Sequence, residues 1–202
     1  YTYPNGKRAI ENFNGEFKMG EKYLIKGESG AGKSTLLKLI AGYLKGYEGS
    51  IYYDDENLED ISWPSLMEQI AYIGQDVYIF NETIKFNITL GKDVDQSLYE
   101  KAISVSELES FIQGKKEKDA FILDGGGENI SGGERQRIAI SRAIASGKKI
   151  WFIDEGLQGM DEKTREKVET NLLKEDVLLL MISHVSKERE KEYTDQITIG
   201  SI

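Results

Sequence analysis

The sequence predicts an α/β fold with a mostly parallel β-sheet. Two apolar runs, IWFID at 150–154 and VLLLMIS at 177–183, lack the alternation of a half-buried strand. Such runs are typical of central parallel strands, which are buried on both faces. Other strand-like runs alternate along the chain with amphipathic helical stretches, and this order indicates strands joined by helical crossovers.

The remaining elements follow from local patterns. Short apolar or β-branched runs predict further strands at 22–26, 50–53, 70–74 and 196–200. Apolar residues at helical spacing predict helices at 33–44, 96–112, 132–146 and 161–174. Gly147 is a suitable C-cap for the third of these helices. The middle of the chain, about 85–145, is rich in helical patterns, so we expect a helical insertion between two halves of an α/β core.

Composition limits the function classes. The chain has 202 residues, enough for one domain, and 39% of them are hydrophobic, enough for a core. It contains no cysteine, which excludes disulfides and thiolate metal sites, and no apolar run is long enough for a membrane span. The net charge of −9 argues against a nucleic-acid partner, so an anion site must be local. Because the chain starts at Tyr1 rather than Met, we expect a domain excised from a longer protein.

A glycine-rich loop follows the first predicted strand. The stretch KYLIKGESGAGKSTLLKLI fits the pattern strand–GxxxxGK[ST]–helix, in which backbone N–H groups surround phosphates. The lysine adds a charge at the β- and γ-phosphates, and the next hydroxyl can ligate Mg²⁺. A glycine turn with an incidental lysine is a poor alternative, because these glycines would cost chain entropy without a use. The predicted phosphate ligands are Gly27, Glu28, Ser29, Gly30, Ala31, Gly32, Lys33, Ser34 and Thr35, with Ser34 also a metal ligand.

Polar residues end three of the predicted strands. Ligands of parallel α/β sheets bind at the carboxyl ends of the strands. Asp154 ends IWFID and is predicted to hold Mg²⁺ through water, while Glu155 can polarise an attacking water. His184, the only histidine, follows LLLMIS and can hold the γ-phosphate, although a lone histidine is usually a satisfied polar residue. Gln75 ends a third strand and can reach the metal or the water, although a strand-end glutamine usually faces solvent.

A second glycine–helix junction lies in ENISGGERQRIAI, residues 128–140. Its small residues expose backbone N–H groups, and the N-terminus of the following helix carries a positive partial charge. The junction is therefore suited to hold an anion. The phosphate loop near residue 30 already supplies one such site, so the sequence poses the question of which phosphate the second junction binds.

Together these motifs resemble the nucleotide-binding domain of ATP-binding cassette (ABC) transporters, and the resemblance covers nearly the whole chain. GESGAGKST looks like the Walker A motif, and WFIDE looks like Walker B with the catalytic glutamate. GQD looks like the Q-loop, ISGGERQR like the signature motif, GMD like the D-loop and SH like the switch histidine. The order and spacing of these motifs agree with the family. Tyr3 matches the family's A-loop tyrosine, which stacks on adenine; a packed terminal aromatic residue is the alternative.

The resemblance implies a P-loop ABC ATPase fold. This fold has a mostly parallel sheet, an N-terminal antiparallel β part, and a helical subdomain inserted between the Q-loop and the signature motif. We expect residues 1–202 to form a single nucleotide-binding domain, with a RecA-like core at about 1–84 and 147–202 and the helical subdomain at about 85–146. The implied cofactors are ATP and Mg²⁺, with the metal near Ser34, Gln75 and Asp154.

The resemblance also implies an ATPase that drives an exporter. In the family, two nucleotide-binding domains close head-to-tail over two Mg-ATP, so the expected partner is a second copy or a homologous domain. Segment 75–88 resembles the exporter region that contacts the transmembrane domain, which implies a soluble domain at the cytoplasmic face of the cell membrane. The implied catalytic residues are Glu155, His184, Gln75 and Lys33. The residues implied at the partner's ATP are Ser131, Gly132, Gly133 and Asp161.

Several positions depart from the family pattern. Gly125 stands where exporters usually carry a glutamate, and GLQGM replaces the usual Thr/Ser-rich segment after the catalytic glutamate. Within the signature motif, Ile130 and Glu134 replace the usual Leu and Gln. Arg135 and Arg137 are predicted to make ion pairs or interface contacts rather than to take part in the chemistry.

Other functions are weighed against this one. The second hypothesis is a soluble ABC ATPase in DNA repair or translation. DNA-repair relatives place a long coiled coil before the signature motif, and ribosome-acting relatives carry two cassettes, neither of which is present here. The third hypothesis, a non-hydrolysing regulatory cassette, conflicts with the intact Glu155, His184 and Gln75. A P-loop kinase would leave the second glycine junction unexplained.

Overall fold

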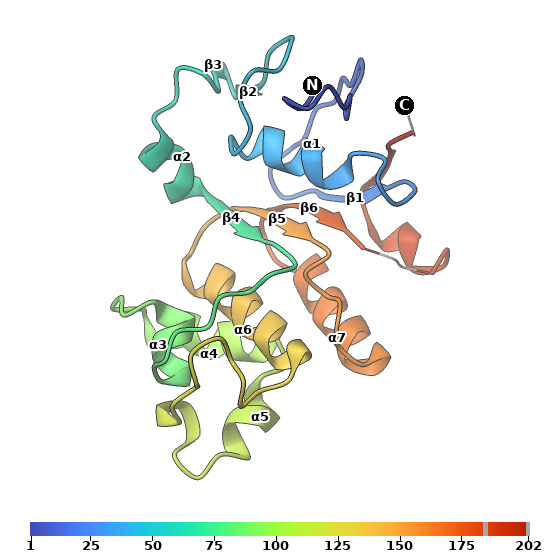
Figure 1. Cartoon of the computed structure of the whole chain (residues 1–202). Helices are drawn as coiled ribbons and strands as arrows, with labels where there is room; N and C mark the ends of the chain where they lie inside the picture. The colour runs from blue at the N-terminus through green and yellow to red at the C-terminus, as the bar shows by residue number, and fades with distance from the viewer. Residues whose placement is uncertain (184–185, 201–202) are drawn as a thin grey trace. The chain divides into compact units, whose positions relative to one another are not determined.

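The computed structural model describes residues 1–183 and 186–200 and is drawn in Figure 1. The chain forms two compact units. The first unit consists of residues 1–72, 149–154 and the segment from 177 to the C-terminal end. The second unit consists of residues 73–148 and 155–176.

The described part of the first unit contains a five-stranded sheet. Its strands are β1 (Lys22–Lys26), β4 (Ile70–Ile73), β5 (Ile150–Asp154), β6 (Leu178–Ile182) and β7 (Asp195–Thr198), in the spatial order β4-β5-β6-β1-β7. The pairs β5–β6, β6–β1 and β1–β7 are parallel. Every residue of β5 and β6 is buried, as expected of central parallel strands. The predicted α/β fold with a mostly parallel sheet is confirmed.

Helix α1 (Lys33–Ile40) packs on one face of this sheet. Because side chains alternate along a strand, every second residue of β1, β5 and β6 faces the helix. Burial of each large aliphatic side chain in this layer contributes roughly 1.5–3 kcal/mol. Because α1 is packed against β1, β5 and β6 in this layer, the position of its first turn is held relative to the sheet. The loop that joins β1 to α1 is thereby held at both of its ends. The residues of this layer include Tyr23, Ile25, Leu36, Leu37, Ile150, Phe152, Leu178, Leu180 and Ile182.

Helix α1 ends four residues earlier than the sequence pattern predicts. Gly42 adopts a left-handed backbone, with φ of 74°. Its N–H donates to Leu39 O at 3.0 Å, and the N–H of Tyr43 donates to Lys38 O at 2.9 Å. This is the usual way in which a glycine ends a helix. Tyr43 and Leu44, which extend the apolar stripe in the sequence, therefore lie outside the helix.

The antiparallel β part of the first unit is small. Strands β2 (Tyr52–Tyr53) and β3 (Glu56–Asn57) form an antiparallel pair, and Thr2 and Arg8 form an isolated antiparallel bridge near the N-terminus. Helix α2 (Trp63–Gln69) follows and was not predicted from the sequence. Its start does carry a local signal, since the Ser62 side chain accepts the N–H of Ser65 and a proline occupies the first turn.

The second unit is helical in its described residues. Helix α6 (Gly132–Ala145) packs against both α3 (Ile84–Thr89) and α4 (Gln96–Val105), and α4 also contacts α7 (Glu162–Leu173). Gly147 has φ of 70° just beyond α6, so its predicted role at the end of this helix is confirmed. No helix of the described chain is both long and apolar enough to cross a membrane. The same unit also contains α5 (Glu109–Gln113) and a short 3-10 helix, Lys118–Ala120.

The single helix predicted at 96–112 is in fact α4 and α5. The break lies at Ser106, whose buried Oγ donates back to Ala102 O at 2.8 Å and hydrogen-bonds Ser141 Oγ of α6 at 2.5 Å. The next residue, Glu107, has φ of 58°, a left-handed conformation that a helix cannot continue. A buried contact with α6 therefore interrupts a stretch that is helical by pattern.

Candidate functional site

The predicted phosphate loop joins β1 to α1, and two of its glycines are required by sterics. Gly27 has φ of 149°, and a Cβ there would lie 2.5 Å from Ile199 O. Gly32 has φ of 100°, and a Cβ there would lie 2.2 Å from Ala9 O. Gly32 also precedes the first turn of α1, which carries no side-chain cap and no acidic residue. The N–H groups of that turn are thus available to an anion.

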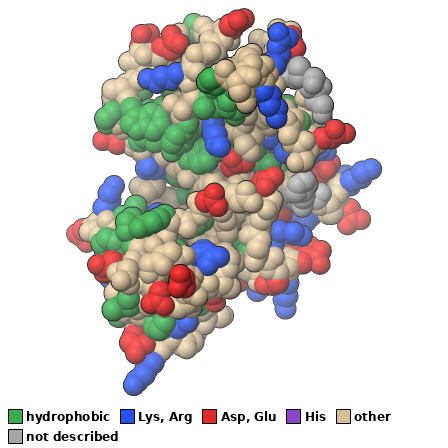
Figure 2. Space-filling view, in the orientation of Figure 1, with side chains coloured by type: hydrophobic (Ala, Val, Ile, Leu, Met, Phe, Trp, Pro, Cys, Tyr) green, Lys and Arg blue, Asp and Glu red, His purple; other side chains and the backbone are tan. Residues whose placement is uncertain are grey.

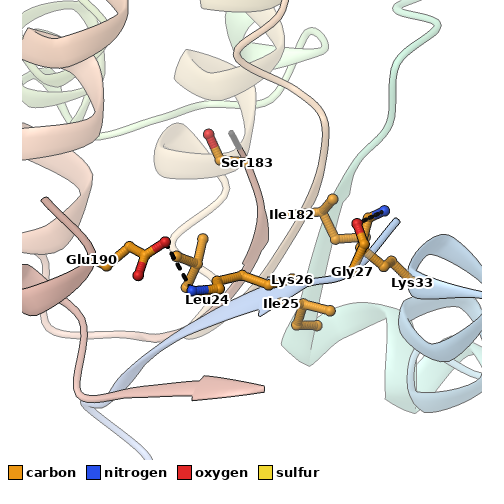
Figure 3. A pocket seen from close by; sticks show the side chains of 8 residues that line it. All are labelled: Leu24, Ile25, Lys26, Gly27, Lys33, Ile182, Ser183 and Glu190. Carbon is orange, nitrogen blue, oxygen red and sulfur yellow. Dashed lines mark hydrogen bonds and ion pairs between the residues drawn. The ribbon is translucent and has the colours of Figure 1, made fainter. Parts of the chain in front are cut away.

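The Lys33 side chain closes the loop on itself. Its ammonium donates to Gly27 O at 2.8 Å and to Glu28 O at 2.7 Å, and the residue is only 8% exposed. Figure 3 shows Lys33 and Gly27 at one side of a cavity of roughly 180 Å³. At the other side, Lys26 and Glu190 form an ion pair of 2.8 Å. A positive charge is therefore held at the loop before any phosphate binds.

Asp154 lies at the carboxyl end of β5, next to the loop serine. Ser34 Oγ donates to Asp154 Oδ1 at 2.7 Å, and Tyr72 Oη donates to Asp154 Oδ2 at 2.8 Å. Asp154 is only 7% exposed. Burial, followed by the negative charge of Asp154 and the hydrogen bond to it, raises the pKa of the Tyr72 phenol, which therefore stays protonated and donates.

The oxygen atoms of Ser34 and Asp154 together are chemically suited to a Mg²⁺ site. A hydroxyl and a carboxylate are hard oxygen donors, and Mg²⁺ bound with a nucleotide takes few protein ligands because phosphates and waters complete its octahedron. Among the described residues, no cluster of three or more His, Cys, Asp or Glu side chains could hold a metal alone. Ser34 and Asp154 suit a metal that arrives with a phosphate group, because phosphate oxygens and waters would supply its other ligands.

Tyr3 lies beside the same loop. Its hydroxyl hydrogen-bonds the hydroxyl of Thr35 at 2.9 Å, and its ring packs edge-on against Tyr1 with the centroids 5.0 Å apart. Its predicted stacking on adenine stays a prediction. Within the first unit, the structure thus brings Tyr3, the phosphate loop and Asp154 together.

The second glycine junction forms the N-terminus of α6. Ser131 Oγ accepts the N–H of Glu134 at 3.2 Å, and Glu134 Oε2 accepts the N–H of Ser131 at 2.7 Å, which is a complete capping box. The capping box thus explains the glutamate at position 134, where the family usually has a glutamine. The two arginines that follow bind backbone carbonyls: Arg135 donates to Gly127 O at 2.9 Å, and Arg137 donates to Glu107 O. Both hydrogen bonds lie within the second unit and stabilise it.

The segment after Asp154 packs against that junction. A Cβ at Gly133 would lie 2.9 Å from Gly159 O, so this glycine allows the close approach. Asp161 caps α7, where its carboxylate accepts the N–H of Thr164 at 3.0 Å. Hydrogen bonds from the Thr164 side chain and backbone lower the pKa of Asp161. Within the second unit, Gly132 and Gly133 therefore lie close to the Gly159–Asp161 loop.

Glu155 follows Asp154 directly and has an unusual backbone. Its φ is 56°, a left-handed conformation that costs a residue other than glycine on the order of 1–3 kcal/mol. Gln158 closes the turn: its N–H donates to Glu155 O at 3.1 Å, and its Nε2 donates to Glu155 Oε2 at 2.6 Å. The side-chain direction of Glu155 is thus set by local structure. His184, the remaining candidate, lies outside the described residues.

Gln75 is held through its backbone. Gln136 of α6, 6% exposed, donates from Nε2 to Gln75 O at 2.7 Å. This contact links the residue predicted near the metal to the helix that carries the second junction.

The contributions of Tyr72, Gln136 and Gln158 were not predicted from the sequence. The spacing of the motifs does not indicate these three hydrogen bonds. Each one depends on which backbone oxygen or carboxylate the folded chain places next to the donor side chain.

Segment 75–88 presents aromatic side chains. Tyr78 is 68% exposed and Phe80 is 38% exposed, with their ring centroids 4.9 Å apart. Arg142 of α6 lies over the Phe80 ring at 5.9 Å and donates to Tyr78 O at 3.2 Å and Asn87 O at 2.9 Å. The fully buried Asn87 side chain in turn binds the backbone of Phe80. The aromatic surface is thus supported by a fixed backbone.

The glycine sterics give a direct prediction. Gly32→Ala is expected to lower the free energy of unfolding by about 3 kcal/mol and to abolish nucleotide binding, because the Cβ would clash with Ala9 O. Gly30→Ala is the matched control, since Gly30 also has positive φ (81°) but nothing lies within 4 Å of its Cβ. That control should lose only about 1 kcal/mol. Urea unfolding measures both, and equal losses would contradict the clash.

The parallel sheet, the glycine loop between β1 and α1, and the contact of Ser34 with Asp154 define a P-loop nucleotide-binding protein. A family model described as ABC transporter matches residues 10–158. The chain belongs to this family, and it aligns with one part of longer proteins that are named as exporters. The resemblance inferred from the motifs is confirmed.

Relatives of the chain agree with this assignment. The chain is 32% identical to the microcin-J25 export ATP-binding/permease protein McjD of Escherichia coli, over 91% of the chain and 32% of that protein. It is 33% identical to the mitochondrial iron-sulfur clusters transporter atm1 of Aspergillus fumigatus, over 95% of the chain and 25% of that protein. A solved structure of a bacterial Atm1-family ABC exporter with ATP bound matches with a TM-score of 0.84 and 26% identity, over 94% of the chain and 34% of the exporter chain. The chain thus spans about a third or less of the length of these relatives.

Proposed function

We propose that the chain binds ATP with Mg²⁺ and hydrolyses it to drive an exporter. The observation that carries this proposal is the contact of Ser34 Oγ with Asp154 Oδ1, 2.7 Å, beside a glycine loop closed by Lys33. This arrangement suits a triphosphate with its metal better than a phosphate alone. The export functions named for the relatives support the direction of transport.

The catalytic roles follow from chemistry at the γ-phosphate. Lys33 exchanges its loop carbonyls for phosphate oxygens and stabilises the charge that develops there. Glu155 orients the water for in-line attack, and Gln75 and His184 hold the water and the γ-phosphate. Mg²⁺, when bound, neutralises phosphate charge, with Ser34 as a ligand and Asp154 and Gln75 beside it.

The active form is proposed to be a head-to-tail dimer over two Mg-ATP. The first-turn N–H groups of a helix have no intrahelical partner, so those of Gly132 and Gly133 can bind the γ-phosphate of ATP in the partner domain. Ser131 and Asp161 contribute to that same interface. In this arrangement the second glycine junction binds the partner's γ-phosphate, and the Gly27–Thr35 loop binds the phosphates of the chain's own ATP. The partner is a second copy of this chain or a homologous domain.

The second partner is the transmembrane domain of the exporter. The exposed aromatic pair Tyr78 and Phe80 suits a protein surface, because aromatic side chains are enriched at interfaces. The domain therefore works at the cytoplasmic face of the membrane. We do not expect nucleic acid as a partner, because the net charge is −9 and acidic and basic side chains are interspersed on the face shown in Figure 2.

Mixing two inactive variants tests the shared site. Lys33→Ala removes the loop charge, and Ser131→Asp places a carboxylate at the partner's phosphate while keeping an N-cap acceptor. A mixed dimer regains one complete site, so ATPase activity should rise from near zero to a substantial fraction of wild type. Ser62→Asp, at the cap of α2, is the matched control and should stay active alone.

The outcomes separate the alternative functions. Recovery in the mixture supports the head-to-tail ATPase. No recovery, with both variants folded, would contradict site sharing. Wild-type protein that binds ATP without turnover, alone and with its membrane domain, would instead indicate a regulatory cassette. ATPase activity stimulated by DNA or ribosomes rather than by the membrane domain would indicate a soluble ABC ATPase.

A further inference from the structure

Asp154 has a second hydrogen-bond partner that the proposed chemistry leaves without a role. Its Oδ1 accepts from Ser34, which is a proposed Mg²⁺ ligand, whereas its Oδ2 accepts from the hydroxyl of Tyr72 at 2.8 Å. We propose that Tyr72 is a positioning residue for the Mg²⁺ site, because its phenol fixes the Asp154 carboxylate with Oδ1 turned toward Ser34. This inference rests on the proposed binding of Mg-ATP.

The position of the Tyr72 hydroxyl is set by packing. Strand β4 lies next to β5 in the sheet, so Tyr72 reaches the last residue of the neighbouring strand. Its ring meets Tyr43 edge-on, with centroids 5.1 Å apart and planes at 68°, and lies 6.5 Å from Phe152. Tyr43 in turn packs edge-on against Trp63 of α2, 5.1 Å away. Figure 2 shows hydrophobic side chains gathered over α2 and the end of α1. The phenol is therefore a preorganised donor.

Two effects of this hydrogen bond on the metal oppose each other. A donor at Oδ2 draws charge from the carboxylate, which weakens its attraction for a cation. The same donor holds one orientation of the carboxylate, which Mg²⁺ requires because it demands near-ideal octahedral geometry. Hydrogen bonds to metal-binding carboxylates typically raise metal affinity or activity by about 10- to 100-fold. Orientation is therefore the larger effect, and Tyr72 should strengthen the metal site.

The hydrogen bond also explains the location of a tyrosine here. Asp154 is 7% exposed, so water has little access to its carboxylate. An aliphatic residue at position 72 would fill the same layer but would leave Oδ2 without this donor. A residue that only packs in the core needs no hydroxyl, and Phe152 in the neighbouring strand has none. The hydroxyl is therefore what separates the positioning role from a packing role.

The test compares nucleotide affinity with and without metal. Calorimetry with a non-hydrolysable ATP analogue, in Mg²⁺ and in EDTA, measures binding independently of turnover. For Tyr72→Phe, the affinity in EDTA should equal that of wild type, while the gain in affinity on adding Mg²⁺ should fall by about 10-fold. The half-saturating Mg²⁺ concentration should rise by a similar factor. Placing 4-aminophenylalanine at position 72 keeps the ring and a donor and should restore the gain.

Tyr43→Phe is the matched control. It removes the hydroxyl of the adjacent tyrosine, which faces Met67 Sδ at 3.8 Å rather than Asp154, so the Mg²⁺ dependence should not change. Equal losses for Tyr72→Phe in Mg²⁺ and EDTA, or no loss at all, would overturn the inference. A Tyr72→Phe protein that does not fold would assign the hydroxyl to stability and would also overturn it. If the nucleotide affinity of the wild-type protein were the same in Mg²⁺ and in EDTA, the proposed function would be overturned as well.

Discussion

Replacing Glu155 by glutamine should reduce ATP hydrolysis by about 100-fold or more and leave ATP binding intact. The amide has nearly the same shape as the carboxylate but cannot accept the proton of an attacking water. The left-handed backbone at Glu155 and its turn to Gln158 do not depend on the charge, so the fold should persist. Phosphate release and equilibrium ATP binding measure the two effects separately.

The Glu155→Gln protein should also accumulate as an ATP-bound dimer. If hydrolysis opens the dimer, a variant that binds without hydrolysing stays closed. Size-exclusion chromatography with Mg-ATP would detect this change. Glu68→Gln, an exposed carboxylate on α2, is the matched control and should hydrolyse ATP as wild type does. Turnover of Glu155→Gln at the wild-type rate would refute the role given to Glu155.

Lys33→Met is expected to weaken ATP binding by about 100-fold or more. Methionine fills a similar volume but carries no charge, and Lys33 is the one basic residue in the sequence from Gly27 to Thr35. Charge-assisted contacts to phosphate are among the stronger hydrogen bonds in proteins. The variant also leaves Gly27 O and Glu28 O without the ammonium that now binds them. Fluorescent-nucleotide titration measures the affinity.

Lys38→Met tests whether this loss comes from the loop charge. Lys38 lies on the exposed side of the same helix, so the change in net charge and in helix composition is the same. Its ATP affinity should match that of wild type. A comparable loss in both variants would mean that the overall charge of the domain, rather than the position of Lys33, governs binding.

The strands and the phosphate loop were well predicted because their signals are local. The bounds of β1 and β5 match the prediction residue for residue, and β6 lies within its predicted range. The helices were predicted less well. The pattern over 96–112 is helical throughout, but a buried hydrogen bond between Ser106 and Ser141 of α6 interrupts it. That contact joins residues far apart in the sequence and leaves no trace in the local periodicity.

The candidate site shows the same division. Ser34 and Asp154 were placed together because strand ends in a parallel sheet share one edge, and the structure brings them to 2.7 Å. No comparable rule about strand ends predicts the hydrogen bond of Tyr72 to Asp154 or that of Gln136 to Gln75. The roles of Ser131, Gly132, Gly133, Glu155, Gln75 and His184 stay predictions.

The sequence by itself determined the class of fold, the phosphate loop and the family, because each depends on residue types at fixed spacing along the chain. The tertiary structure alone decided where α4 ends and which side chains support the loop, Asp154 and Gln75, whereas the end of α1 is set locally by Gly42. The physical reason is that a hydrogen-bond partner is chosen by strand order and packing. Both are set by the burial of many side chains at once, rather than by any short stretch of sequence.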